Sequence, residues 1–356
     1  MHLGATPDLE QLQQLAEEAA ASESKLSVDR WRAALTELAR HLQQPMSLPD
    51  TERFEAVLKA YLRRILRSEL SGDDARFLAL WQRDLGFLLK YKSYGVKCAT
   101  ALGYSVFLQN PGEGFSFQRH VIRKTEIFHI IEPLQRALVF LCTSRQWEAL
   151  YEPARFDRWL DGAPDDALER LAVRPKAGGV YHVSSLGQVH SVLGCILEEF
   201  ATVSTDMVDR LHDQNAGRHD PLVPRAIVTA RLRSLSSHPP CVAQVSGPSS
   251  AAIVRFGNAQ IYELTKGPFD AIRLHVEQGS VELPADPLRA RILFTVAGQA
   301  ACEIRGSGDA PRVAPPAIDV RGGDILMIPP GVVTTIQVVS RAACSIQSIE
   351  PEVALA

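Results

Sequence analysis

The period of the hydrophobic pattern changes near residue 95, and this change restricts the possible folds more than any other feature of the chain. Before it, segments around residues 8–21, 28–43 and 50–65 place apolar residues three and four positions apart, as amphipathic helices do. After it, short runs rich in valine, isoleucine and phenylalanine are broken by glycine and proline, as strands are. The pattern predicts an α+β protein with its helices first and its strands afterwards.

The strand-like runs form two groups separated by residues 236–250, which are small, polar and proline-containing and are typical of a linker. We therefore expect a helical region at 1–93, a first β unit at 94–235 and a second at 251–356, in keeping with a length of 356 residues. A charged helical insertion at 143–175 has to leave the first unit and could form a lid or wall of a pocket. The expected strands are 103–109, 115–121, 126–131, 137–142, 179–183 and 194–203, then 252–256, 271–276, 290–297, 300–304, 324–328 and 333–339.

Bulk composition argues against several classes of partner. A formal net charge of -3 gives no electrostatic reason to expect binding to nucleic acid or to an anionic membrane surface. No apolar run approaches the roughly 18 residues of a membrane span. The six cysteines form no Cys-x-x-Cys pair, and Cys142, Cys195 and Cys302 lie in apolar runs, so we expect buried reduced thiols and a cytoplasmic protein.

Chemistry-bearing residues concentrate in the stretch from Phe117 to Glu126. If the stretch is a strand, Gln118 and His120 share one face, with Phe115, Phe117 and Arg119 on the other. About 65 residues later a lone histidine, His190, follows a tight glycine turn in the sequence Ser-Leu-Gly-Gln-Val-His. These side chains are of the types that hold a metal ion.

The two stretches together resemble the cupin superfamily, and sugar-isomerase-type cupins in particular. The family's first motif runs His-x-His and then a Lys/Thr/Glu cluster, matched here by Gln118-Arg119-His120 and Lys124-Thr125-Glu126. Its second motif, Gly-x-x-His, is matched by Gly187 to His190. The resemblance implies two β-barrel domains, a bicupin, with His120, Glu126 and His190 as ligands of one divalent transition metal (Zn, Fe, Mn or Ni).

The chain departs from the family pattern at three places. Gln118 stands where the family has its first histidine, and Ser185-Leu186 replaces the proline ahead of the glycine turn. In the second unit Thr334 occupies the position of the ligand histidine, so we expect that barrel to pack or to recognise and to hold no metal. Gln118 is then a fourth ligand or an orienting donor, and we assign Gln118 and Arg119 to substrate binding.

Two further residues receive catalytic roles by the resemblance. Lys124 is placed to stabilise a developing enolate, and Glu199 to move a proton, since only one of the adjacent Glu198 and Glu199 faces inward on a strand. Each assignment has a plainer alternative. The histidines would then be interior groups with satisfied hydrogen bonds, Glu126 a rim carboxylate pairing with Lys124 or Arg123, and Lys124 a solvated residue at a strand end.

The resulting hypothesis is a metal-dependent cupin enzyme that acts on a small, polar, oxygen-rich substrate, most simply as a sugar or sugar-phosphate isomerase or epimerase. One alternative is an iron-dependent oxygenase of small-molecule metabolism. Another is a non-catalytic sugar-binding or assembly bicupin. The presence of Gln118 and Thr334 at positions where the family has ligand histidines agrees with this alternative. A homodimer through barrel edges, the usual cupin pairing, is compatible with each.

Overall fold

The computed structural model describes residues 28–42, 48–68, 70–84, 88–92, 95–100, 102–183, 186–202, 208–213, 225–235, 241–242, 253–256, 259–306, 316–338 and 341–351. The helix expected at 8–21 and most of the linker expected at 236–250 lie outside these residues. None of the helices in the described part is both long enough and apolar enough to cross a membrane.

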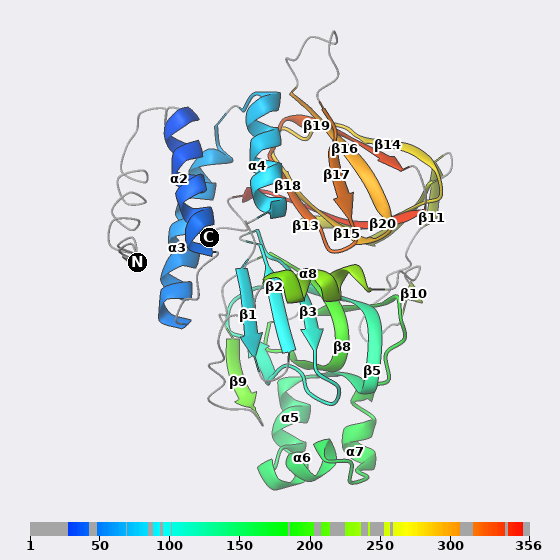
Figure 1. Cartoon of the computed structure of the whole chain (residues 1–356). Helices are drawn as coiled ribbons and strands as arrows, with labels where there is room; N and C mark the ends of the chain where they lie inside the picture. The colour runs from blue at the N-terminus through cyan, green and yellow to red at the C-terminus, as the bar shows by residue number, and fades with distance from the viewer. Residues whose placement is uncertain are drawn as a thin grey trace.

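Three N-terminal helices, α2 (Val28–Leu42), α3 (Leu48–Ile65) and α4 (Gly72–Asp84), bear out the helical period of this region. Each buries one apolar stripe, and Leu35 of α2 and Leu62 of α3 are fully inaccessible to solvent. Ser71 caps α4 by accepting a hydrogen bond from the backbone N–H of Asp74 at 3.2 Å. Helix α4 lies against the second β unit, so the helices brace that unit (Figure 1).

The helical region ends earlier than its expected limit at residue 93. The segment Leu88–Lys92 is a strand, β1, which forms a hairpin with β2 (Gly95–Ala99). A short apolar run such as this one fits a helix and a strand equally well, and only the neighbouring strand resolves the choice.

The first β unit is an antiparallel jelly roll in which two long strands serve both sheets. The N-terminal half of β5 and the C-terminal half of β8 lie between β3 and β7, in the order β3-β8-β5-β7. The other halves lie between β4 and β6, in the order β4-β8-β5-β6. The strands are β3 (Tyr104–Gln109), β4 (Phe117–His120), β5 (Glu126–Cys142), β6 (Ala172–Val173), β7 (Gly179–Val183) and β8 (Val189–Ala201), with β9 (Val208–His212) and β10 (Cys241–Val242) at the edges.

The bend that lets β5 and β8 change sheets lies at matching points of the two strands. Their register shifts between Pro133 and Leu138, where Arg136 has a φ of 64°, opposite Gly194 with a φ of 61°. A side chain at residue 194 would meet the carbonyl oxygen of Gln135 at 3.1 Å, so glycine is needed on both counts. The sequence pattern shows this corner as a break, which is why it predicts two strands where one bent strand exists.

The second β unit repeats this strand order. Its sheets run β13-β20-β15-β18 and β14-β19-β16-β17, and the hairpin β11–β12 extends the first sheet as β1–β2 does in the first unit. Both units thus have the jelly-roll order of cupin barrels, which confirms the α+β fold with two such barrels. The strands are β11 (Ile253–Phe256), β12 (Ala259–Thr265), β13 (Phe269–Val276), β14 (Gly279–Leu283), β15 (Ala290–Ala297), β16 (Gln299–Gly306), β17 (Ile318–Arg321), β18 (Ile325–Ile328), β19 (Val332–Val338) and β20 (Ala342–Ile349).

The interior of the second barrel is an apolar core of leucine, isoleucine, valine and cysteine side chains. Thr334 is fully buried in this barrel, and His275 lies on the opposite face of its sheet beside Tyr262. The second barrel is therefore packed as a structural unit. Five cysteines, Cys98, Cys142, Cys195, Cys302 and Cys344, are buried free thiols, as the sequence predicts.

The insertion forms the helices α5 (Ser144–Leu150), α6 (Pro153–Leu160) and α7 (Asp166–Glu169). An aromatic cluster joins it to the outer face of the first barrel, with Phe117 and Phe140 of the barrel packed against Trp147 and Phe156. The insertion therefore covers the outside of the sheet, so it is not the lid considered from the sequence. It does form one wall of a surface hollow of about 270 Å³ beside Arg136.

The two barrels pack through the outer faces of their larger sheets, with α8 (Arg225–Arg233) between them (Figure 1). A charged cluster is buried within this apolar interface. Glu198 of β8 accepts hydrogen bonds from Tyr104 at 2.8 Å and from Arg273 of the second barrel, and lies 2.6 Å from Nδ1 of His129. All four side chains are at most 1% exposed, so Arg273 ties the barrels together by neutralising a carboxylate that lies buried within the interface.

This cluster predicts an acid-sensitive interface. Burial raises the pKa of Glu198, but Arg273 and His129 outweigh it and hold the pKa at about 2, against an ordinary value of 4.5. Because the folded-state pKa is depressed, the stabilisation is present above pH 4.5 and is lost as pH falls toward 2. Denaturant titrations across this window should show stability falling by a few kcal/mol, and the Glu198→Gln variant should show a shallower pH dependence. An identical pH slope in both proteins would contradict this assignment.

Candidate metal centre

The candidate site lies at the end of the first barrel where two connections pass between its sheets. Strand β4 ends at His120 and β5 begins at Glu126, so the loop between them carries one ligand candidate at each end. The turn from β7 to β8 leads to His190 through Gly187, whose φ of 76° favours glycine. The Gly187 N–H donates to the carbonyl oxygen of His120 at 3.4 Å, which joins the two connections.

The three predicted metal ligands meet at this point. Oε2 of Glu126 lies 3.2 Å from Nε2 of His120 and 3.4 Å from Nε2 of His190. All three ligand atoms lie within 4.8 Å of one another, and none of the three residues is more than 1% exposed. Two imidazole nitrogens and a carboxylate oxygen converge here, from positions separated by up to 70 residues of sequence.

The hydrogen bonding of this cluster fits a bound cation. Nδ1 of His190 lies 3.1 Å from the carbonyl oxygen of Gln188 and donates to it, and in the neutral imidazole this places the lone pair on Nε2, which lies beside Glu126. Nε2 of His120 and Oε2 of Glu126 are buried, and neither has a hydrogen-bond partner among the residues that the structure describes. Buried polar atoms of this kind are costly unless something binds them, and a divalent transition metal suits two imidazoles and one carboxylate.

Lys124 neutralises the carboxylate of this group. Its ammonium contacts Oε1 of Glu126, the oxygen that does not face the histidines, and is itself only 4% exposed. Burial raises the pKa of Glu126, but Lys124, His120 and His190 together hold it well below its usual range. The pairing of Glu126 with Lys124 considered as a plain alternative therefore exists, and it leaves the second oxygen available for a cation.

Glu199 faces the inside of the barrel, as predicted for one member of the Glu198–Glu199 pair. It lies opposite Phe128 in the strand register, and Phe128 belongs to the interior core of the barrel. Its Oε1 is 3.9 Å from the ammonium of Lys124. The structure thus brings Lys124 and Glu199 together beside the candidate metal ligands.

The two residues assigned to substrate binding lie in different places. Gln118 is the direct cross-strand neighbour of His190, and its Nε2 lies 3.3 Å from Nε2 of that histidine. Arg119 has the opposite orientation and pairs with Asp209 of β9 at 3.0 Å, so the structure does not bring it into the cluster. Phe115 also departs from the expected alternation by packing in the interior against Phe107, because β4 begins only at Phe117.

Sequence reasoning missed the groups that hold the ligands in place. The carbonyl of Gln188 fixes the tautomer of His190, and Ser144 donates to the carbonyl of Gly187 at 2.6 Å, which ties the insertion to the ligand turn. Ser116 donates to Oε1 of Gln118 at 3.3 Å and so orients its amide. Ser116 and Gln188 each lie two residues before the side chain that they hold, so both contacts are local in sequence, whereas the Ser144 contact depends on tertiary packing.

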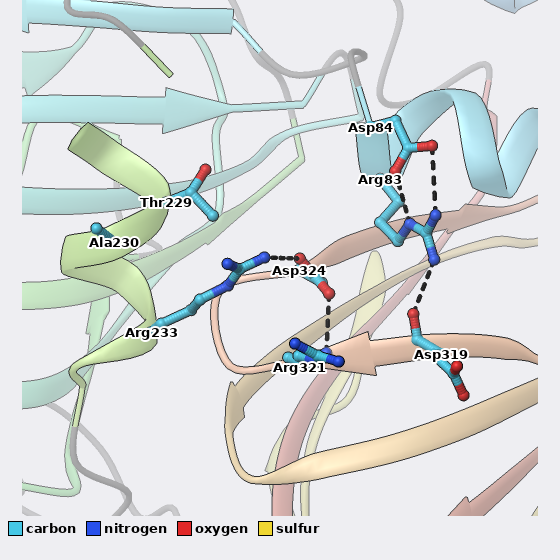
Figure 2. Close-up of a pocket in the computed structure, with 8 residues that line it drawn as sticks. All are labelled: Arg83, Asp84, Thr229, Ala230, Arg233, Asp319, Arg321 and Asp324. Carbon is cyan, nitrogen blue, oxygen red and sulfur yellow. Dashed lines mark hydrogen bonds and ion pairs between the residues drawn. The ribbon is translucent and has the colours of Figure 1, made fainter. Parts of the chain in front are cut away.

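A separate cleft of about 610 Å³ lies between α4, α8 and the turn from β17 to β18 (Figure 2). Its charged side chains are largely engaged with one another. Arg83 donates to Asp84 and to the carbonyl of Asp319, while Asp324 accepts from the backbone N–H of Arg321 and lies 3.9 Å from Arg233. These contacts join a helix, the interbarrel segment and the second barrel, and we interpret the cleft as a structural junction.

Comparison with known proteins finds similarity only among solved structures. No family model matches the chain, and no curated protein matches it. The mannose 6-phosphate isomerase of Bacillus subtilis is 15% identical, with 68% of this chain and 74% of that one covered and a TM-score of 0.46. The oxalate decarboxylase of Bacillus subtilis at pH 4.6 is 11% identical, with 74% of each chain covered and a TM-score of 0.44. The bicupin fold of this chain rests on its strand order, and these likenesses add no argument about its activity.

The first test concerns the metal itself. Elemental analysis of the purified protein should find a transition metal near stoichiometric amount, and the His120→Ala and His190→Ala variants should lose it, since each removes one of three ligands. The His129→Ala variant, which changes a buried histidine outside the cluster, should keep it. Retention of metal by both ligand variants would exclude this site.

A substitution of Gln118 should increase the affinity for metal, whereas the histidine substitutions decrease it. The amide of Gln118 donates to the lone pair of His190 that a metal needs, so metal binding requires the amide to turn over, after which Ser116 can accept from it. In the Gln118→His variant, a stronger ligand replaces this competing donor, and metal affinity should rise about tenfold or more in chelator competition. An unchanged affinity would show that Gln118 does not face the metal.

Proposed function

We propose that this protein is a metal-dependent cupin enzyme acting on a small, polar, oxygen-rich substrate, with isomerisation or epimerisation of a sugar or sugar phosphate as its reaction. The observation that carries the proposal is the convergence of His120, Glu126 and His190, with buried ligand atoms that have no hydrogen-bond partner in the described part of the chain. Lys124 and Glu199 beside this group supply a cation and a second carboxylate. A purely structural cluster has no need of both.

In the proposed reaction each residue has a separate task. When bound by His120, Glu126 and His190, the metal supplies Lewis-acid polarisation of a carbonyl and its neighbouring hydroxyl. Glu199 takes the proton from the carbon beside the carbonyl and returns it to the adjacent carbon, while the hydroxyl proton passes from one substrate oxygen to the other, which completes isomerisation. For epimerisation the deprotonated substrate has to turn its other face to Glu199 before the proton returns to the same carbon. Lys124 stabilises the negative charge that develops on the substrate oxygen. The buried setting excludes water and strengthens both electrostatic effects.

Loss of the Glu199 carboxylate tests this assignment. The Glu199→Gln variant should retain its metal, because Glu199 is not a ligand, and should lose about 10²- to 10⁴-fold in turnover. Assays of a panel of aldoses and their phosphates in deuterated water, followed by NMR, should show deuterium entering at the carbon that exchanges its proton. Absence of exchange and of product with the metal-loaded wild type would overturn the proposed reaction.

An iron-dependent oxygenase is the second candidate, favoured by the composition of the site. Two histidines and one carboxylate with the other positions open is the ligand set of non-haem iron oxygenases. Oxygen consumption by the iron-loaded protein, together with a product that has gained oxygen, would select this candidate, since isomerisation conserves the molecular formula. A wild type that takes up no metal would instead leave the non-catalytic binding protein.

A further inference from the structure

Large exposed apolar side chains are rare in the described part of the chain, and two of the three lie at the candidate site. They are Val121, 55% exposed, and Leu186, 63% exposed; the third, Leu288, is 68% exposed in the second barrel. Val121 follows His120 directly, and Leu186 precedes Gly187. Isolated exposed apolar residues are ordinary on a protein surface, but two beside one buried polar site are a pattern.

A backbone hydrogen bond brings these two residues to the same end of the first barrel. The Gly187 N–H donates to the carbonyl oxygen of His120, so the residue after His120 and the residue before Gly187 flank one hydrogen bond. Both belong to the connections that pass between the sheets at the end where the ligand candidates lie. The inward-facing side chains at this end are polar and buried, whereas Val121 and Leu186 are exposed and apolar, and the cation Arg123 is exposed beside them.

The contrast between the buried polar side chains and the exposed Val121 and Leu186 indicates the shape and chemistry of a ligand. A polar group bound by the metal, Lys124 and Glu199 would lie inside, and anything attached to it would emerge past Val121 and Leu186. A bare sugar would leave both apolar side chains in water, whereas an aliphatic or aromatic substituent would cover them at a gain of about 0.8 kcal/mol per buried methylene. A protein partner is the weaker explanation, because two side chains fall far short of the ~800 Å² that each side of a standard interface buries.

We propose that Val121 and Leu186 are specificity-determining residues, and that the substrate is amphiphilic, with an oxygen-donor head and an apolar substituent that lies across these two side chains. The inference rests on the proposed function and narrows its substrate class. It excludes small unsubstituted sugars as the preferred substrates and favours hydroxy-carbonyl or carboxylate compounds that bear an apolar tail.

Two hydroxamates, which bind metals through two oxygens, test whether Val121 and Leu186 contact an apolar substituent of the ligand. Calorimetric titration of the metal-loaded protein should show octanohydroxamate binding at least about tenfold more tightly than acetohydroxamate. The Val121→Ser/Leu186→Ser double variant should lose that advantage while its affinity for acetohydroxamate stays the same, because the head group is held elsewhere. The Leu288→Ser variant is the matched control, with an equally exposed leucine replaced far from the site, and should keep the full advantage.

The outcomes separate this inference from the function on which it rests. Equal affinity for the two hydroxamates in the wild type, or an advantage that survives in the double variant, would overturn the role of Val121 and Leu186. If the protein takes up no metal, the proposed function fails, and the role of these two residues is then tested by methyl NMR with octanoate. Chemical-shift changes confined to the Val121 and Leu186 methyl groups would support the proposal that these residues bind an apolar substituent. The absence of such changes would overturn it.

Discussion

The pairing of β5 with β8 is the constraint on which the rest of the first barrel depends. Because side chains alternate along a strand, this one register sends Phe128 and Glu199 into the barrel and sends their neighbours His129 and Glu198 outward. A slip by one residue would exchange the two sets and would place the outward carboxylate in the site. The bend at Gly194 then allows the same two strands to build both sheets.

The sheet that contains β5 and β8 has a buried carboxylate on each of its two faces. Inside, Glu126 divides its oxygens between Lys124 and the two histidines, which leaves the histidine side ready for a cation. Outside, Glu198 is satisfied by Tyr104 and by Arg273 of the second barrel. A buried carboxylate needs a partner on either face, and the partner outside comes from the other barrel. The second barrel thus supports the first through apolar contacts between the two outer faces and through the guanidinium of Arg273.

Prediction from sequence succeeded where a local pattern reports directly on structure. The helical period of residues 28–65 and the strand-like runs at 179–183 and 290–297 correspond closely to helices and strands. Prediction failed for β20, in which polar residues lie among the buried apolar ones. Strand β20 lies at the centre of its sheet between β13 and β15, and its Ser345 and Gln347 face the first barrel, so its pattern does not resemble a strand. The position of the insertion on the outer face likewise depends on aromatic contacts with Phe117 and Phe140 that no local pattern reveals.

The sequence by itself determined the order of the chain's parts and the chemical types at the site, since the resemblance of two short stretches to cupin motifs singles out His120, Glu126 and His190. Its alternation also indicated that only one of Glu198 and Glu199 faces inward. Only the tertiary structure decided that the three ligand candidates meet, because they lie on different strands whose proximity follows from the closure of the barrel. It also decided that Arg119 pairs with Asp209, that Arg273 reaches Glu198, and that the Gly187 N–H donates to the carbonyl oxygen of His120. Such contacts join residues 65 or more positions apart, and hydrophobic periodicity carries information only across a few turns or one strand.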